Sequence, residues 1–460
     1  MVPDPLRTSW TGASLVRRLG PFDGAAVVIS NVIGGGIFFL PSLVAQSINQ
    51  PWWMLGAWGA GGLLAFSGAM AYAELAAFRP RSGGEYVYLR EAFGPMAAFL
   101  TGWTSFVAGF SGAIAVSAVA LASYLGSFLP FVDGSQSLVA VSEGLFTLSV
   151  SPQVILALMT IWGLTAVHVV GLGTGRFVQN LLAGAKVALL VAFVGMGFAV
   201  GEGSWTHFGV GVGRVSGSGW ALALLPVMFA YSGWNAAAYL AEELKDPGRN
   251  VPLALGLGTA TVTVIYLMLN LLYIYALPIS ELAVVNENVA YAVSERLFGS
   301  AIALPIAGAS IIMIAASISA MVFAGPRVYF AMAQDGLFFV QASRIHPVFR
   351  TPATAIIAQS LWASILVLTG TFEQLVAFTA FAVVLFAGVA VGALFVLRAR
   401  NPTAERPFKA WGYPFAPFLF IVVSMAMVAN SIWRSPVISV AGLVVIAAGI
   451  PIYFFMRRVR

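Results

Sequence analysis

The chain has 460 residues, of which 60% are hydrophobic and 9% are charged, and its formal net charge is +6. It contains no cysteine, which excludes disulfides and thiolate metal sites. Its three histidines do not form pairs with metal-site spacing, and no basic cluster is interleaved with aromatic residues. The composition therefore predicts an all-α polytopic membrane protein without a cofactor, a metal or a nucleic-acid partner.

Hydrophobic runs bounded by turn residues predict about twelve transmembrane helices. They lie near residues 22–46, 53–78, 92–129, 153–170, 177–200, 219–241, 252–276, 301–333, 353–369, 372–397, 414–432 and 437–456, with an outer loop at 131–151. Placing the basic loops together leaves few arginines on the other side, namely Arg214, Arg296 and Arg434. Because cytoplasmic loops are rich in Lys and Arg, we expect both termini in the cytoplasm and a location in the plasma membrane.

The first span contains the segment VVISNVIGGGIFFLP at residues 27–41, in which Gly34, Gly35 and Gly36 interrupt the apolar run. A glycine costs about 1 kcal/mol relative to alanine in a helix interior. A bare amide in hydrocarbon costs several kcal/mol more, so the break should face protein, water or a ligand. A helix broken in the membrane presents carbonyls on one side and amide donors on the other, which suits an ammonium and a carboxylate. Alternatively, the glycines only let neighbouring helices pack closely.

Glu74 lies about one turn from the cytoplasmic end of the second span. Its expected role is that of a snorkelling or paired acid at the membrane interface. The alternative is an inner gate formed with an arginine, for which the candidates are Arg79, Arg81 and Arg327.

Lys186 is the second informative residue of the predicted spans. It follows Arg176 by ten positions, about 15 Å along a helix, which places it near the middle of the fifth span. A charge at that depth costs about 2.5–3.5 kcal/mol on insertion scales, so Lys186 should face the bundle interior. The eighth span offers hydroxyl partners in Ser310, Ser317 and Ser319. A purely structural lysine is the alternative.

The sixth span, ALALLPVMFAYSGWNAAAYLAEE at residues 221–243, is interrupted at Ser232 and Gly233. Two broken spans five helices apart are typical of an inverted-repeat transporter, whose site lies between the discontinuous helices 1 and 6. We therefore expect four parts: a cytoplasmic N-terminal segment, two five-helix repeats, and helices 11 and 12 with the cytoplasmic C-terminus, at residues 1–20, 21–200, 201–398 and 399–460.

Several motifs together carry a resemblance to a known family. They are IGGGIF at 33–38 with Pro41, YAEL at 72–75, SGGEYVYL at 82–89, FAYSGWN at 229–235, EELKDPGRNVP at 242–252 and RVYFAMAQDG at 327–336. With these motifs the chain resembles the amino acid-polyamine-organocation (APC) superfamily and, within it, bacterial permeases of the L-type amino acid transporter family. The resemblance covers most of the first ten spans.

The resemblance implies a five-plus-five inverted-repeat fold and a set of site residues. The substrate carboxylate would lie on Gly35 and Gly36, and Phe229 would cover the substrate as a gate. Lys186, with Ser317, would stand where sodium-driven relatives bind a cation. The substrate ammonium would lie near the carbonyls of residues 32, 229, 230 and 232. The candidate substrate-binding residues are Val32, Gly34, Gly35, Gly36, Ile37, Phe229, Ala230, Ser232 and Asn235.

The chain departs from the family at two points. The family motif usually has serine where this chain has Gly35, so a hydroxyl contact to the carboxylate is lost. Eukaryotic relatives use a cysteine to join a heavy-chain glycoprotein, and this chain has none. We therefore expect no disulfide-linked heavy chain.

These observations predict a secondary transporter that exchanges neutral amino acids. The two pocket segments, residues 30–38 and 229–235, contain no acid or base to match a charged substrate side chain, and they leave alanine-sized and leucine-sized substrates open. Proton-coupled uptake is the first alternative, and it applies if Lys186 loses its proton during the cycle. A non-transporting amino acid sensor is the second. An intramembrane enzyme is disfavoured, because it would need titratable groups that converge inside the membrane, and only Lys186 and Glu74 qualify.

Overall fold

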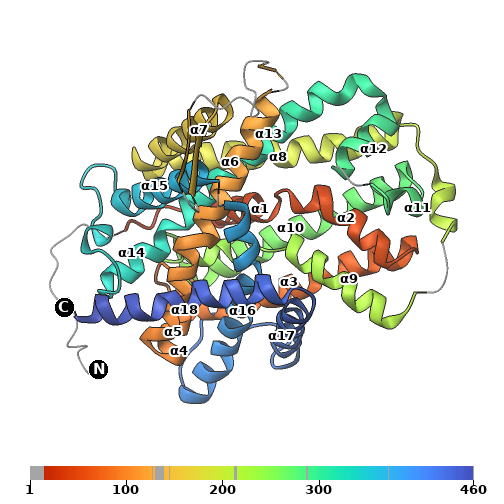
Figure 1. Ribbon diagram of the computed structural model, residues 1–460. Coiled ribbons are helices and arrows are strands. Elements are labelled where there is room, and N and C mark those ends of the chain that lie inside the picture. The colour runs from red at the N-terminus through yellow and green to blue at the C-terminus, as the bar shows by residue number, and fades with distance from the viewer. Residues whose placement is uncertain are drawn as a thin grey trace.

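The computed structural model describes residues 15–458 except residues 127, 130–138, 144–145, 212–214, 286–287 and 371. Within these residues the chain is a bundle of long helices that run largely between two ends of the molecule (Figure 1). Arg214, which the sequence analysis placed on the outer side, lies outside the described residues.

The elements of the first half are α1 (Pro21–Val32), α2 (Gly36–Ser47), α3 (Pro51–Phe78), α4 (Glu85–Phe93), α5 (Pro95–Thr104), the π-helical η1 (Ser105–Gly109), α6 (Phe110–Gly126), β1 (Val139–Glu143), β2 (Phe146–Val150), α7 (Pro152–Val169) and α8 (Leu172–Val200). The second half contains η2 (Trp205–Gly209), α9 (Gly217–Ala230), η3 (Ala236–Leu240), α10 (Pro247–Ala276), α11 (Ile279–Leu282), α12 (Val289–Phe298), η4 (Ser300–Ile302), α13 (Ala303–Ala324), α14 (Pro326–Gln334), η5 (Val340–Ser343), α15 (Ala353–Thr369) and α16 (Phe372–Arg400). Two further helices close the chain, α17 (Phe415–Arg434) and α18 (Pro436–Arg458).

Nine helices of the described chain are long and apolar enough to cross a membrane, and the bent pair α1 and α2 adds a tenth span. The shorter apolar helices α9 and α15 coincide with two further predicted hydrophobic runs. All twelve runs are therefore helical, which confirms the prediction of an all-α polytopic membrane protein. By helix length and composition, the described residues contain ten spans that could cross a membrane, fewer than the twelve predicted runs.

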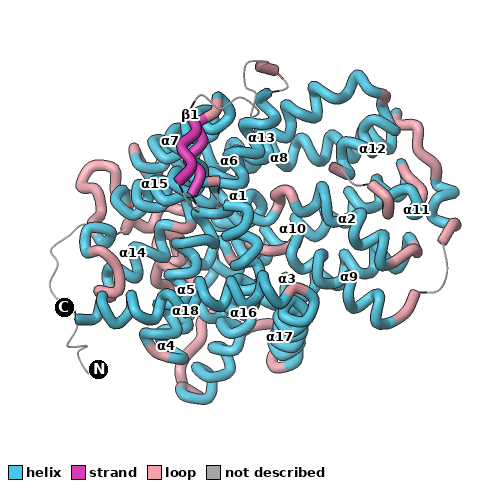
Figure 2. The backbone as a smooth tube through the Cα atoms, viewed as in Figure 1, coloured by secondary structure: helices cyan, strands magenta, loops and turns pink. Residues whose placement is uncertain are grey.

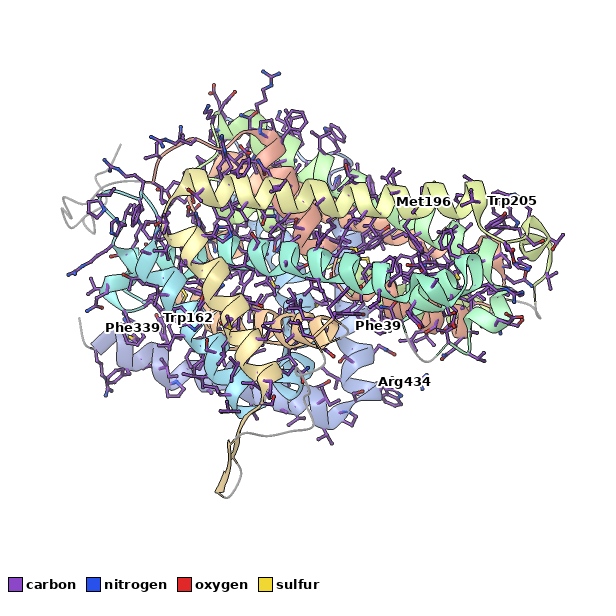
Figure 3. All side chains as sticks on the ribbon, turned by 90° about the horizontal axis from the view of Figure 1, so that it is seen from above. Phe39, Trp162, Met196, Trp205, Phe339 and Arg434 are labelled. Atoms are coloured by element: carbon purple, nitrogen blue, oxygen red, sulfur yellow. The ribbon has the colours of Figure 1, made fainter. Side chains whose placement is uncertain are left out.

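A short β-hairpin occupies part of the segment that the sequence analysis expected to be an outer loop. Strands β1 and β2 pair antiparallel, with Val139 opposite Val150. The pairing follows from alternating β-branched, apolar and small polar residues on both sides of the connection. The hairpin is the magenta element of Figure 2, and it projects from the helical body in the view of Figure 3.

Proline sets the start of many helices. It occupies the first helical position where the amide would have no intrahelical acceptor, so its missing N–H costs nothing there. The helices that begin in this way include α1, α3, α5, α7, α10 and α18. At α1 the carboxylate of Asp23 also accepts the N–H of Gly20 at 2.7 Å, which satisfies one donor at the helix N-terminus.

Helix α3 packs closely against α9 and α10 because small residues line its face. A Cβ atom at Gly61 would lie 2.3 Å from Val227 Cγ1, and one at Gly62 would lie 2.4 Å from Thr263 Cγ2. Glycine lets the backbones approach, as is usual between membrane helices. This packing holds α9 and α10 beside the first broken span.

Different helices lie at the two ends of the bundle. Helices α2, α9, α11 and α12 gather at one end, and α14 and the end of α18 lie toward the other (Figure 1). Figure 3 shows the same division, with Met196 and Trp205 near one end and Phe339 at the opposite end. The interruptions between α1 and α2 and between α9 and η3 lie between these ends (Figure 1).

Candidate functional site

The triple-glycine segment is a break in the first span, as predicted. Helix α1 ends at Val32, α2 begins at Gly36, and the two are bent by 53°. The N–H of Gly34 donates to Val32 O at 2.8 Å. In the part of the chain that the structure describes, the N–H groups of Gly35, Gly36 and Ile37 have no acceptor. The start of α2 therefore presents three unpaired donors at the positive end of a helix dipole, which suits an anion.

Close packing accounts for only one of the three glycines. A Cβ at Gly36 would lie 3.2 Å from Ala230 Cα, so this position needs glycine for the approach of α9. A Cβ at Gly34 would meet nothing within 4 Å, and one at Gly35 would meet only the ring of Phe39 at 3.8 Å. Space is open beside both of these residues. This observation favours a binding site over the packing alternative.

The sixth span is also broken, as the sequence predicted. Helix α9 ends at Ala230, and the chain turns before the short helix η3. Gly233 has a φ of +102°, and a Cβ there would lie 3.0 Å from Asn31 O. Only glycine fits this conformation at this distance from α1.

The carboxyl ends of α1 and α9 meet at a tyrosine that the sequence analysis did not single out. Tyr266 OH of α10 lies 3.0 Å from Val32 O and 3.0 Å from Ala230 O. Both carbonyls end helices, so the negative ends of two helix dipoles converge. No local motif marks Tyr266, because a tyrosine in an apolar span is common and only its contacts across the bundle distinguish it.

The predicted substrate-binding residues all lie at or beside the two breaks, but their exposure differs. Gly35 is exposed and Phe229 is 45% exposed, whereas Val32, Ile37 and Ala230 are buried. The partly buried members are Gly34, Gly36, Ser232 and Asn235. The amide of Asn235 is already engaged, since its Nδ2 donates to Glu85 Oε2 at 2.9 Å and to Tyr239 OH at 3.1 Å.

The two sides of the site differ in how exposed their residues are. All five residues of η3 are buried, in contrast to Gly35 and Phe229. Behind η3, Glu243 Oε1 accepts from Arg327 Nε at 2.7 Å, and both side chains are fully buried. A buried pair of this kind excludes water and fixes the relative position of η3 and α14.

Lys186 lies in contact with the first break and with α13. Its Nζ donates to Ser30 O at 3.0 Å, to Ile33 O at 2.5 Å and to Ser317 Oγ at 2.9 Å. A hydroxyl partner was predicted among three serines of the eighth span, and this partner is Ser317. Ser319 instead bonds to the ring of His168, with Oγ 2.9 Å from Nε2.

The chain has extensive similarity to characterised transporters. The family model described as Amino acid permease matches residues 19–456. The serine/threonine exchanger SteT of Bacillus subtilis is 28% identical over 447 residues, which cover 96% of this chain and 98% of the relative. The cystine/glutamate transporter of Homo sapiens is 31% identical over 451 residues, covering 96% and 85%. The large neutral amino acids transporter small subunit 2 of Mus musculus is 29% identical over 458 residues, covering 96% and 81%.

The chain belongs to the amino acid permease family. This confirms the resemblance to the APC superfamily and the prediction of a multi-pass transporter, and it identifies the chain as a permease and not an enzyme. The match reaches from the residues before α1 almost to the end of α18, so the whole described bundle of the permease belongs to the family region.

The structure decides between the two interpretations of Glu74 in the permease. Its Oε2 lies 2.5 Å from Arg398 Nη2 and its Oε1 lies 3.1 Å from Arg406 Nε. The proposed gate partners bind other acids, since Arg79 pairs with Glu91, Arg81 with Asp335 and Arg327 with Glu243. The gate alternative is therefore wrong, and Glu74 is the paired acid that was expected.

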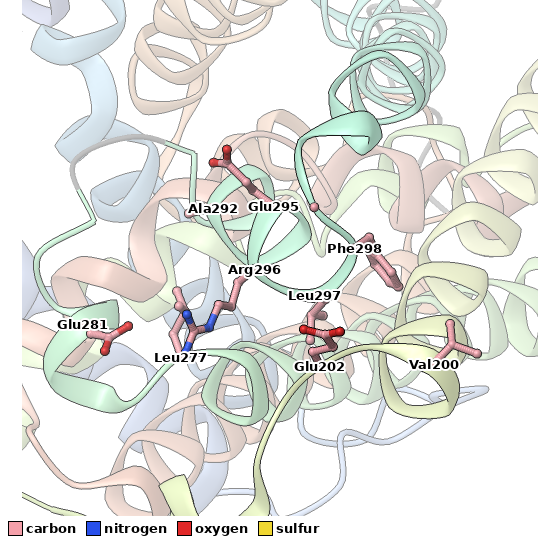
Figure 4. A pocket seen from close by; sticks show the side chains of 10 residues that line it. Val200, Glu202, Leu277, Glu281, Ala292, Glu295, Arg296, Leu297 and Phe298 are labelled. Atoms are coloured by element: carbon pink, nitrogen blue, oxygen red, sulfur yellow. The ribbon is translucent and has the colours of Figure 1, made fainter.

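An open pocket of about 880 Å³ lies away from the two breaks of the permease (Figure 4). It forms where the ends of α8 and α10 face α12, and its lining includes Glu202, Glu281, Glu295 and Arg296. None of its lining residues is a predicted substrate-binding residue. The site at the breaks and this pocket are therefore separate features.

We expect Gly233→Ala to destabilise the permease. The methyl group would require a φ that alanine rarely adopts and would press on Asn31 O, which together cost about 1–3 kcal/mol. Thermal unfolding of the purified protein in detergent measures this loss. Gly59→Ala is the matched control, because its Cβ would meet nothing within 4 Å and α3 is an ordinary helix. Equal melting temperatures for both variants would contradict the strained turn.

Proposed function

We propose that this permease exchanges neutral amino acids across the cell membrane, with both termini in the cytoplasm. The observation that carries the proposal is the meeting of three helix ends at one place. The start of α2 offers unpaired N–H groups, and the ends of α1 and α9 offer carbonyls joined by Tyr266. A zwitterion carries one group for each kind of helix end.

The carboxylate would accept hydrogen bonds from the N–H groups of Gly35, Gly36 and Ile37. Such bonds to a charged group contribute roughly 1.5–3 kcal/mol each. The ammonium would donate to Ala230 O, which has a lone pair left after its bond to Tyr266. Val32 O already accepts from Gly34 N–H and Tyr266 OH, so a contact of the ammonium with Val32 O would replace one of these bonds. The expected contacts at Phe229 O and Ser232 O stay part of the proposal, as does the role of Phe229 as a gate.

The names of the relatives support amino acids as the substrate class and exchange as the mode, since one is a serine/threonine exchanger. Exchange requires that the site open alternately to each side. The described conformation exposes Gly35 and Phe229 and buries η3, and we assign the α2 and α9 end to the outside because the basic loops lie at the other end. Lys186 would then hold α1 to α13 through the cycle, in the place of a bound cation.

The division into repeats at residues 21–200 and 201–398 is part of the same proposal. It is supported by the two breaks, which occur in the first span of each segment. With no cysteine in its 460 residues, the permease has no residue for a disulfide to a heavy chain, and we propose that it transports without one. Residues 399–460, which hold α17 and α18, would form the part outside both repeats.

Neutral amino acids should compete for transport, whereas arginine and lysine should not. The segments at the breaks, residues 30–38 and 229–235, carry no charged side chain to pair with a cationic substrate. Burial of an unpaired substrate charge there would cost several kcal/mol. Inhibition of labelled serine or leucine uptake by each of the twenty amino acids tests this. Inhibition by arginine or lysine alone would refute the neutral substrate class.

Flux in liposomes tests the transport proposal itself. Purified permease is reconstituted, and uptake of labelled neutral amino acids is measured with and without unlabelled amino acid inside. An exchanger takes up label only in the loaded vesicles. Uptake driven by a pH gradient into empty vesicles would favour proton-coupled uptake, and binding without any uptake would favour a sensor.

A further inference from the structure

A buried carboxylate lies directly behind the second break. Glu85, the first residue of α4, is 8% exposed. Its Oε2 accepts from Tyr72 OH at 2.8 Å and from Asn235 Nδ2 at 2.9 Å, and its Oε1 accepts from Tyr239 OH at 3.0 Å. In the described chain no lysine, arginine or histidine contacts it. Glu85 is therefore a buried acid among neutral donors.

Three other acids at this end of the bundle differ from Glu85 because arginines neutralise them. Glu74 pairs with Arg398, Glu243 with Arg327, and Asp335 with Arg81 and Arg90. Glu85 is not paired in this way, although it belongs to the same group of inner loops and helix ends. Among the described residues, no positively charged side chain therefore stabilises the ionised form of Glu85.

The titratable groups that face Glu85 are all phenols. They come from three elements, with Tyr72 on α3, Tyr88 on α4 and Tyr239 on η3. Burial raises the pKa of Glu85 above its ordinary value of 4.5, and the hydrogen bonds from Tyr72, Tyr239 and Asn235 oppose part of this rise. The environment thus favours the protonated acid more than water does.

The cluster can accommodate both protonation states. The ionised carboxylate accepts all three hydrogen bonds. The protonated acid can donate its own O–H to the oxygen of Tyr72 or Tyr239, because a phenol both donates and accepts. Neither state leaves Glu85 buried without a hydrogen-bond partner.

Glu85 lies at a contact that must open if the site is to face the cytoplasm. The N–H of Gly83 donates to Tyr239 O at 3.3 Å, and the N–H of Ser82 donates to Glu242 Oε2 at 3.1 Å. Gly84 has a φ of +53°, and a Cβ there would lie 2.6 Å from the ring of Tyr239. The start of α4 is therefore pressed against η3. Separation of the two would transfer Glu85 from a buried position to cytoplasmic water.

We propose that Glu85 is a proton-binding site, which takes up a proton when α4 and η3 close the cytoplasmic side and releases it when they part. The carboxylate gains one proton from water to become a carboxylic acid, and the same proton returns to the cytoplasm on opening. No other reactant is required. The inference rests on the proposed function, because it assumes that the permease alternates between closed and open states on the cytoplasmic side.

The pH dependence has a defined sign. In the closed state the pKa of Glu85 is raised, and in the open state, in water, it is close to the ordinary 4.5. The closed state therefore binds more protons, and low pH favours it. This advantage is lost as the pH rises from about 4.5 through the raised pKa of the closed state. Opening on the cytoplasmic side should increase over that range.

Single-cysteine labelling measures the opening directly, because the chain has no cysteine of its own. Ser82→Cys places a thiol of similar size at a position that is 1% exposed in the closed state. An impermeant thiol reagent is applied to the cytoplasmic face across the pH range. Thr403→Cys, at an exposed loop position, corrects for the pH dependence of the thiol itself.

The corrected labelling rate should rise several-fold with pH in the Ser82→Cys protein. With Glu85→Gln added, which stands for the protonated acid, the rate should stay low and independent of pH. Tyr72→Phe removes a donor that favours the ionised form, so it should move the midpoint to higher pH. Tyr273→Phe is the matched control, because Tyr273 OH is buried, has no hydrogen-bond partner among the described residues and does not contact Glu85.

A wild-type pH response in the Glu85→Gln protein would overturn the proposal, and so would a Tyr72→Phe midpoint equal to that of Tyr273→Phe. The labelling requires no amino acid flux, so it can be read in a protein that transports nothing. A pH-dependent opening without any exchange in liposomes would refute the proposed function and leave the proton site intact.

Discussion

Replacement of Lys186 by alanine should lower amino acid exchange by tenfold or more while the protein still folds. The ammonium donates three hydrogen bonds, two to the carbonyls of Ser30 and Ile33 at the first break and one to Ser317 on α13. A hydrogen bond to a charged group contributes roughly 1.5–3 kcal/mol. Loss of one such bond from a single state of the cycle already shifts an equilibrium by roughly tenfold or more. Without the ammonium, α1 and α13 are no longer joined at the break.

Two variants separate the charge from other effects. Lys186→Met keeps most of the apolar stem and removes all three donors, so it should be as slow as Lys186→Ala. Gln179→Ala is the control on the same helix, since Gln179 is buried and its Nε2 donates to Ala26 O at 3.5 Å, well before the break. Exchange in liposomes is the measurement, and elution in size-exclusion chromatography checks folding. Unaltered exchange by Lys186→Ala would eliminate the bridging role.

The same liposomes distinguish the two mechanisms that the sequence left open. If the lysine stays protonated throughout the cycle, a pH gradient across empty vesicles should drive no accumulation of amino acid. If it loses its proton, the gradient should drive uptake, and Lys186→Ala should abolish that uptake. Strong gradient-driven accumulation by the unmodified permease would reject the exchanger mechanism.

The breaks could be predicted from the sequence because lipid makes their physical cost large. Three successive glycines in an apolar run at Gly34–Gly36, and a Ser-Gly pair at Ser232 and Gly233, stand out where a continuous helix is otherwise required. A lysine in the middle of a span is just as conspicuous, and its need for partners points to the bundle interior. Such features depend on the bilayer more than on details of packing.

The residues that the sequence could not identify are those whose role depends on long-range contacts. Tyr266 is one of several tyrosines in α10, and only the structure shows that its hydroxyl reaches the ends of both α1 and α9. Glu85 appeared only as one letter of a motif, because its burial depends on the packing of α4 against α3 and η3. The same limit applies to Glu74. The sequence offers many arginines as possible partners, and only the structure shows that Glu74 binds Arg398 and Arg406.

Gly35→Val should abolish measurable substrate binding, and this effect should come from bulk alone. Gly35 has a φ of −61° and a ψ of −27°, a conformation that any residue adopts, so valine does not strain the backbone. A Cβ there meets only Phe39 within 4 Å, so the side chain would fill the open space before the unpaired N–H groups of α2. A substrate carboxylate could then no longer reach those donors.

The expected loss is at least tenfold in affinity, because even one hydrogen bond to a carboxylate contributes roughly 1.5–3 kcal/mol. Gly56→Val provides the matched control, since Gly56 lies in α3, away from the breaks, and a Cβ there meets nothing within 4 Å. Both variants should fold, and only Gly35→Val should lose binding when labelled amino acid is measured against the purified proteins. Near-normal affinity in Gly35→Val would mean that the carboxylate does not bind at the start of α2, and the assignment of the first break as a substrate site would fail with it.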